Sequence, residues 1–274
     1  MYDIFFSIDD YADIALFTTI NSIIKNCTNI QLIKFNILVS KNKDLYNKNI
    51  NERFKDINFE IKEFNETTYK KEYNFLLNYL NMVNPGSFKV HTNIMNFARI
   101  FLPLIFPNTG KCLYLDTDII VQTDILELFK ENIDDNNQCA AVLKRPQDIH
   151  FRYPEYITEI NFKKKKIYNG FNTGVYLFDS RIWRKNNYTE KCIKILKLQL
   201  EKNIMQYGTQ PLINLIFYDK TVNIDERWNV AGAGWDSGVT EELLKDAYII
   251  HWSGRQKPWI EDGLWKFFWN KYKI

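Results

Sequence analysis

The chain of 274 residues is long enough for one large α/β domain or two small ones, and its composition, 46% hydrophobic and 25% charged, is that of a globular protein. A formal net charge of +3 gives no reason to expect a nucleic-acid partner. The four cysteines are far apart and form no Cys-x-x-Cys pair, which argues against a zinc site or a disulfide framework and favours buried thiols in a reducing cytoplasm. No signal peptide and no membrane span is predicted.

The first quarter of the chain alternates between short apolar runs and segments with helical spacing. Strands are predicted at 4–8, 32–39 and 59–64, and helices at 11–24 and 45–54. This order is typical of a mostly parallel sheet with helices on both faces. Asp9 follows the first strand, at the carboxyl end where open α/β sheets bind ligands; a helix N-cap is the alternative for this residue.

The middle of the chain contains the stretch on which the functional reading depends. Residues 66–92 have weak periodicity and are expected to form a loop, and 92–104 are predicted to be a helix that carries Arg99. Arginine suits a bidentate contact with phosphate, although a lone arginine on a helix is commonly a surface charge. Residues 111–121 then form two apolar runs separated by Asp-Thr-Asp.

The two aspartates of this stretch are candidate metal ligands. In extended backbone, positions i and i+2 point to the same side, so Asp116 and Asp118 can converge just past the end of a buried strand. Two carboxylates there suit a hard divalent cation that also holds phosphate oxygens. The alternative is a strand that ends in a solvated acidic turn.

The second half of the chain continues the α/β pattern. Helices are predicted at 124–129, 182–203 and 208–217, strands at 140–143, 175–178 and 247–250, a glycine-rich loop at 231–238, and a solvated lysine run at 163–166. Two asparagines and two glycines precede the strand at 175–178, so the backbone can approach a ligand closely there.

The C-terminal segment adds a third candidate ligand. His251 ends a strand and is followed by Trp-Ser-Gly-Arg-Gln-Lys-Pro-Trp; a histidine here can ligate a metal while Gly254 and Lys257 hold the bridged phosphates, or it can be structural. Residues 264–274 mix aromatic side chains with lysines, which suits either peripheral membrane contact at headgroup level or a helix packed on the domain. We expect one domain at 1–260 with a short C-terminal helical appendage at 261–274.

Taken together and in order, these motifs resemble glycosyltransferase family 8, most closely the retaining galactosyl- and glucosyltransferases of bacterial lipopolysaccharide and lipooligosaccharide. The motifs are the aspartate after the first strand, Ala98-Arg99, Tyr-Leu-Asp-Thr-Asp, Phe-Asn-Thr-Gly-Val and His-Trp-Ser-Gly-Arg-Gln-Lys-Pro-Trp. The resemblance covers nearly the whole chain. It implies the Rossmann-like GT-A fold, a UDP-sugar donor and a divalent cation, Mn²⁺ or else Mg²⁺.

The resemblance also assigns roles to individual positions. It assigns the metal to Asp116, Asp118 and His251. It assigns the nucleotide-sugar contacts to Ser7, Asp9, Arg99, Asp116, Thr117, Gly254 and Lys257. It assigns catalytic positions to Arg99, Asn172 and Gln210, with Gln210 near the anomeric carbon.

Three positions depart from the family pattern. Asp10 is followed by Tyr11-Ala12 where the family often has Asn-Tyr, which puts the base and ribose contacts in doubt. The residues flanking Gln210 are Thr209 and Pro211 in place of aspartates, and Lys144 follows the strand at 140–143 where an aspartate is usual. These two departures lie on the sugar side, so the donor sugar and the acceptor stay open.

The expected function is retaining transfer of galactose or glucose from a UDP-sugar to a saccharide or glycolipid acceptor in cell-surface polysaccharide or lipopolysaccharide synthesis. The expected location is the cytoplasm or the inner face of its membrane. No carboxylate flanks Gln210 and an amide oxygen is a poor nucleophile, so substitution from the leaving-group face is favoured. The alternatives are a phosphatase of the haloacid dehalogenase type, disfavoured by Ile120, and an impaired sugar-nucleotide or glycan-binding module.

Overall fold

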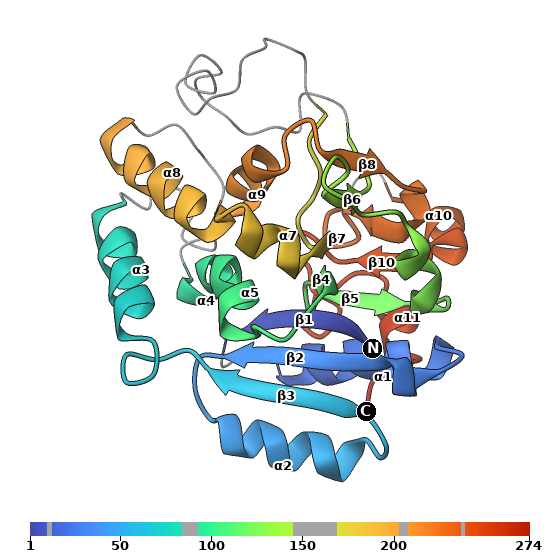
Figure 1. Ribbon diagram of the computed structural model, residues 1–274. Helices are drawn as coiled ribbons and strands as arrows, with labels where there is room; N and C mark the ends of the chain where they lie inside the picture. The colour runs from blue at the N-terminus through green and yellow to red at the C-terminus, as the bar shows by residue number, and fades with distance from the viewer. Residues whose placement is uncertain (10–12, 84–92, 145–168, 203–207, 237–238) are drawn as a thin grey trace.

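The computed structural model describes residues 1–9, 13–83, 93–144, 169–202, 208–236 and 239–274 (Figure 1). A seven-stranded sheet forms its centre. In spatial order the strands are β3 (Asn58–Glu63), β2 (Ile33–Val39), β1 (Tyr2–Ile8), β4 (Lys111–Leu115), β7 (Val175–Asp179), β6 (Cys139–Ala141) and β8 (Thr221–Asn223). Neighbouring strands are parallel except where β7 pairs with β4 and β6. The prediction of a mostly parallel sheet is confirmed.

A second, smaller sheet lies beyond the carboxyl end of β4. It contains β5 (Ile119–Val121), β10 (Ile249–His251) and β9 (Val230–Ala231), with β10 in the middle. Strand β10 is antiparallel to β5 and parallel to β9. Because β5 follows β4 after three residues, this small sheet brings a late segment of the chain to the end of a central strand.

Helices cover both faces of the large sheet. They are α1 (Asp13–Asn26), α2 (Lys43–Arg53), α3 (Lys70–Met82), α4 (Ile94–Ala98), α5 (Leu102–Ile105), α7 (Ser180–Lys185), α8 (Tyr188–Lys202) and α9 (Gln210–Ile216). Two further helices, α10 (Glu241–Asp246) and α11 (Lys266–Asn270), pack with residues of the small sheet. Side chains alternate along β1, so Ile4 and Phe6 pack with α1 and α2, whereas Phe5 packs in the cluster that includes α3, α4, α5 and α7 to α9. Figure 1 shows α2 on one side of the strands and α3, α4 and α8 on the other.

Several elements differ from the sequence-based predictions. Strand β9 was not predicted, and the helix expected at 92–104 is divided into α4, a 3₁₀ turn (Arg99–Phe101) and α5. The region 66–92, expected to be a loop, contains α3, whose narrow apolar stripe buries Leu76 and Tyr79 within a polar sequence. The helix expected at 182–203 is two helices, α7 and α8, because Asn187 adopts the left-handed conformation (φ 53°) that asparagine tolerates. Strand β8 was not predicted; the lysine run at 163–166 lies outside the described residues.

The C-terminal segment packs on the domain. Phe268, Trp269 and Tyr272 are buried together with Trp252, and the rings of Trp252 and Trp269 meet edge to face at 5.5 Å. Phe267 is 54% exposed. Of the two alternatives for this segment, the structure favours the packed helix over membrane contact, because most of its aromatic surface is already covered. Among the described residues, no helix is both long and apolar enough to cross a membrane.

Candidate functional site

Two backbone connections bring the predicted ligands together. Asp116 directly follows β4 and Asp118 directly precedes β5, while His251 is the last residue of β10. The register pairs His251 with Ile119, and the Trp252 N–H donates to the carbonyl of Asp118 over 2.8 Å. The carboxylates and the imidazole therefore lie on one side of the junction between the two sheets.

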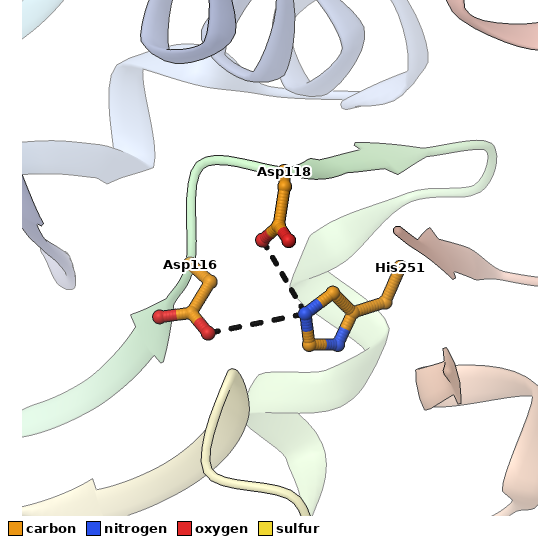
Figure 2. A group of neighbouring side chains, drawn as sticks. All are labelled: Asp116, Asp118 and His251. Atoms are coloured by element: carbon orange, nitrogen blue, oxygen red, sulfur yellow. Dashed lines mark ion pairs between the residues drawn. The ribbon is translucent and has the colours of Figure 1, made fainter. Parts of the chain in front are cut away.

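The three side chains form a compact donor set. One ligand atom from each of Asp116, Asp118 and His251 lies within 4.8 Å of the other two. Figure 2 shows Nε2 of His251 directed between the carboxylates, 3.3 Å from Oδ1 of Asp118 and 3.8 Å from Oδ2 of Asp116. Two carboxylates and one imidazole suit Mn²⁺ or Mg²⁺ better than a thiophilic metal.

A glycine provides the space for this set. A Cβ atom on Gly174 would overlap Cε1 of His251 and lie 2.6 Å from Oδ2 of Asp116. The Gly174 carbonyl also accepts a hydrogen bond from the Asp116 N–H over 2.8 Å, which fixes the backbone of the first ligand. The donor chemistry and this close approach both fit a small cation held by the three residues.

Lys257 supplies positive charge on one side of the set. Its Nζ forms an ion pair with Asp118 and donates to the carbonyl of Trp252 over 2.8 Å. Burial alone would raise the pKa of Asp118, but the charge of Lys257 outweighs burial and holds that pKa well below its usual range. Asp118 is therefore ionised at neutral pH and ready to bind a cation.

Arg99 supplies charge on the other side, and its expected alternative as a surface residue is wrong. It is 7% exposed, and its Nη2 lies 3.4 Å from Oδ1 of Asp116. The guanidinium donates to the carbonyls of Asn96 and Thr173 and stacks over the ring of Tyr114 at 4.5 Å. Burial would lower the pKa of Arg99, but Tyr114 and Asp116 raise it above its ordinary value, so the side chain stays charged.

The side chains of Asn172 and Gln210 contact each other at the start of α9. Gln210 begins α9, and its Oε1 accepts hydrogen bonds from Nδ2 of Asn172 at 3.3 Å and from the Thr173 N–H at 3.4 Å. Thr209, one of the residues that replace the flanking aspartates of the family, is buried and bonded to Asn96 over 2.8 Å. It therefore helps to fix the start of α9 against α4 and is not directed to a ligand.

Of the remaining residues expected to contact the nucleotide sugar, Ser7 and Asp9 lie at the carboxyl end of β1, and Thr117 lies between β4 and β5. Asp9 accepts a hydrogen bond from Asn93 over 2.5 Å, and the Ser7 hydroxyl donates to the carbonyl of Met95 over 2.7 Å. The Thr117 carbonyl accepts a hydrogen bond from Thr19 over 2.8 Å. Strand β1 is a parallel neighbour of β4, so these residues share an edge of the sheet with Asp116. Residues 10–12, the first departure from the family pattern, lie outside the described residues.

Gly254 is constrained by both conformation and space. Its φ of 131° is unfavourable for other residues, and a Cβ atom there would overlap the carbonyl oxygen of Gly234. The two glycines form a bridge that holds the turn after β10. This contact places Lys257, three residues later, over Asp118.

Sequence reasoning missed two polar residues of the site. Tyr114 donates its hydroxyl to Oδ1 of Asp116 over 3.1 Å, and Asn229 lies with Oδ1 at 3.0 Å from Nδ1 of His251. The alternation in β4 places Tyr114 on the same side as Asp116, so a period-two reading could have found it. Asn229 carries no comparable signal, because its contact depends on the pairing of β9 with β10.

Comparisons with known proteins agree on one family. The chain is 31% identical over 191 residues to a protein of Arabidopsis thaliana named probable galacturonosyltransferase 9, covering 66% of this chain and 33% of that protein. It is 28% identical over 242 residues to the mouse glycosyltransferase 8 domain-containing protein 2, covering 78% and 66%. The chain thus spans about a third of the length of the plant relative.

Solved structures show the same fold. The galactosyltransferase LgtC, in complex with donor and acceptor sugar analogs, superposes with a TM-score of 0.72 over 99% of this chain and 95% of that chain at 20% identity. The apo form of the glycosyltransferase GlyE of Streptococcus pneumoniae superposes with a TM-score of 0.67 over 99% of this chain and 59% of that chain at 19% identity. The predicted GT-A fold is confirmed.

The family model described as "Glycosyl transferase family 8" matches residues 3–263. This range includes all three candidate ligands and both sheets, and it decides against the phosphatase alternative. The chain belongs to glycosyltransferase family 8.

Proposed function

We propose that this protein transfers a hexose, galactose or glucose, from a UDP-sugar to a saccharide or glycolipid acceptor with retention of configuration. The observation that carries the proposal is the cluster of Asp116, Asp118 and His251 between the cations Arg99 and Lys257. Two anionic ligands and two fixed cations at one sheet edge match a metal–diphosphate group, which has both signs of charge.

The residues around the cluster have distinct proposed tasks. Asp116, Asp118 and His251 would hold a divalent cation, Mn²⁺ or else Mg²⁺; when bound, it would stabilise charge on the departing diphosphate. Lys257 and Arg99 would add fixed positive charge near the same oxygens, and Gly254 would let the backbone approach them. Ser7, Asp9 and Thr117 would line the nucleotide side.

The polar contacts of Gln210 support a positioning task for this residue. Its Oε1 already accepts two hydrogen bonds, and its NH₂ group has no hydrogen-bond partner among the described residues, so the side chain offers donors and not a nucleophile. In the proposed reaction the acceptor hydroxyl forms the new bond to the anomeric carbon as the bond to UDP breaks. Its proton passes to the leaving phosphate oxygen on the same face.

A second donor class is favoured by Lys144. The Lys144 N–H donates to the carbonyl of Gly170 over 2.7 Å, so the backbone of Lys144 lies beside the segment that carries Asn172, at a position where the family usually has an aspartate. A lysine there could pair with the carboxylate of a uronic acid. The relatives named as probable galacturonosyltransferases point the same way. UDP-galacturonate is therefore the second candidate donor.

A donor screen tests the proposal without knowledge of the acceptor. UDP-glucose, UDP-galactose, UDP-glucuronate and UDP-galacturonate are incubated with the protein and Mn²⁺, and released UDP is measured with and without a chelator. We expect metal-dependent release from one hexose donor. Release from the uronates alone, lost in Lys144→Asp, would establish the second candidate. Binding of UDP-sugars with no release, including with saccharide acceptors, would establish the impaired binding module.

Cell-surface polysaccharide or lipopolysaccharide synthesis is the proposed setting, in the cytoplasm or at the inner face of its membrane. It is supported by the resemblance of the sequence motifs to bacterial enzymes of that kind. The packed C-terminal segment means that the proposal does not depend on membrane contact through residues 261–274.

A further inference from the structure

The side chain of Asn229 lies between His251, one of the candidate metal ligands, and the side-chain amide of Asn172. Asn229 is 3% exposed and ends a 3₁₀ turn (Glu226–Asn229) just before β9. Its Oδ1 lies 3.0 Å from Nδ1 of His251, and its Nδ2 lies 3.3 Å from Oδ1 of Asn172. Asn172 in turn contacts Gln210, so an unbroken row of side-chain hydrogen bonds joins His251 to the start of α9.

A backbone N–H fixes the direction of every hydrogen bond in this row. The Gly174 N–H donates to the side chain of Asn172 over 2.9 Å, so the accepting atom must be the amide oxygen of Asn172. That oxygen also faces Asn229, which must therefore present its NH₂ group. The opposite end of the Asn229 amide is then its oxygen, and this oxygen faces the imidazole.

The imidazole tautomer follows from the same logic. An amide oxygen only accepts, so Nδ1 of His251 must carry the proton that is donated to Asn229. In the neutral ring this leaves the lone pair on Nε2, the nitrogen that faces Asp116 and Asp118. The lone pair of a ligating histidine must point at the metal, so this is the tautomer that a cation in the cluster requires.

We propose that Asn229 is a positioning residue that holds His251 as the Nδ1–H tautomer, with the Nε2 lone pair directed into the Asp116–Asp118 cluster. Through Asn172 the same amide also sets the orientation of Gln210. This inference rests on the proposed metal-dependent function for its purpose, but the tautomer itself is a property of the metal-free protein. The two can therefore be tested separately.

The first experiment reads the tautomer directly. The chain has three histidines, so His91 and His150 are replaced by glutamine and the ring nitrogens of His251 are observed by long-range ¹H–¹⁵N NMR at a pH where the ring is neutral. We expect the Nδ1–H tautomer, retained in Asn229→Asp, whose carboxylate still accepts the proton's hydrogen bond. In Asn229→Ala we expect a mixture of tautomers. Observation of the Nε2–H tautomer in the parent protein overturns the inference.

The second experiment measures Mn²⁺ affinity by calorimetry in the presence of UDP. We expect Asn229→Ala to weaken Mn²⁺ binding about 10- to 100-fold, the range typical when a residue that orients a ligand is removed. Asn229→Asp should bind Mn²⁺ within about threefold of the parent. It should nevertheless lose donor turnover, because its second oxygen repels Oδ1 of Asn172.

A matched control separates positioning from general loss of a buried amide. Asn36 in β2 is fully buried and donates to Asp3 over 2.8 Å, remote from the ligands in the sequence and on a different strand. Asn36→Ala should lower the melting temperature but leave the His251 spectrum and Mn²⁺ affinity unchanged. Equal losses of Mn²⁺ affinity in Asn36→Ala and Asn229→Ala overturn the inference. Absence of Mn²⁺ binding in the parent contradicts the proposed function, while the NMR result still decides the tautomer.

Discussion

The two sides of the site are built differently. On the metal side, ionic groups sit on strand ends: Asp116 follows β4, and His251 ends β10 between two partner strands. On the sugar side, Asn172 and Gln210 are neutral amides that meet at the entrance to a strand and the first turn of a helix. Fixed charges suit the diphosphate that all UDP-sugars share, whereas neutral amides, which both donate and accept hydrogen bonds, suit the sugar, which differs between donors.

The same contrast appears in the departures from the family. The metal side keeps each expected residue, and its cations Arg99 and Lys257 are paired with the aspartates. The sugar side carries Thr209 and Lys144 in place of carboxylates, and Thr209 is used to fix α9 against α4. Changes on this side leave the charge balance of the ligand cluster intact. We therefore expect substitutions on the metal side to remove activity and those on the sugar side to redirect or slow it.

The largest effect is expected for Asp118→Asn. The change removes one anionic ligand at constant shape and leaves Lys257 without its ion-pair partner, so donor turnover should fall on the order of 100-fold or more. Metal-dependent UDP release gives the measurement. Asp124→Asn, at a surface N-cap that asparagine also satisfies, is the matched control and should behave as the parent. Near-normal turnover of Asp118→Asn in excess Mn²⁺ would contradict the ligand assignment.

Gly174→Ala should rank next. The backbone accepts a side chain there, but the added methyl group overlaps His251 and crowds Asp116. We expect Mn²⁺ affinity to fall about 10-fold or more, with a loss of unfolding free energy of about 1–3 kcal/mol. Calorimetry and thermal unfolding measure the two. Gly110→Ala, whose Cβ would meet only ordinary contacts with Arg181 at 3.7 Å, should change neither.

Gln210→Ala probes the other half of the comparison. It should slow turnover about 10- to 100-fold without abolishing it and should leave Mn²⁺ affinity unchanged, because the proposed task of the side chain is to orient the substrate and not to hold the metal. Steady-state rates and calorimetry test both parts. A glycosyl adduct trapped on the parent enzyme would refute the same-face reaction, and loss of Mn²⁺ binding in Gln210→Ala would show that the two sides are not separable.

The smallest effect is expected for Phe267→Ser, outside both sides. Phe267 is the exposed aromatic residue of α11, whose other aromatic side chains are buried. Its replacement should shift the melting temperature by about 2 °C or less and leave sedimentation with anionic liposomes unchanged. A clear loss of liposome binding would reinstate the membrane role of residues 261–274.

The sequence predicted what depends on local pattern. The order of strands and helices from β1 to β3 and the placement of Asp116 and Asp118 just past β4 follow from periodicities of two and 3.6 residues, and the structure confirms them. The break between α7 and α8 was missed because it depends on one left-handed asparagine, Asn187, inside a continuous apolar pattern. Asn229 was missed because its task is defined by strand pairing between distant segments, which no local pattern records.

The pairing of β10 with β5 also bears on how the protein is made. Asp116 and Asp118 emerge from the ribosome long before His251, and β10 has to insert between β5 and β9 before the three side chains can meet. Trp252 then needs Trp269 and Tyr272 to complete its cluster. Such late, non-local closure is slow compared with local folding. Under the proposed function, a nascent chain could hold a metal only once residues 249–272 have joined the fold, so unfinished chains would not sequester cation or donor.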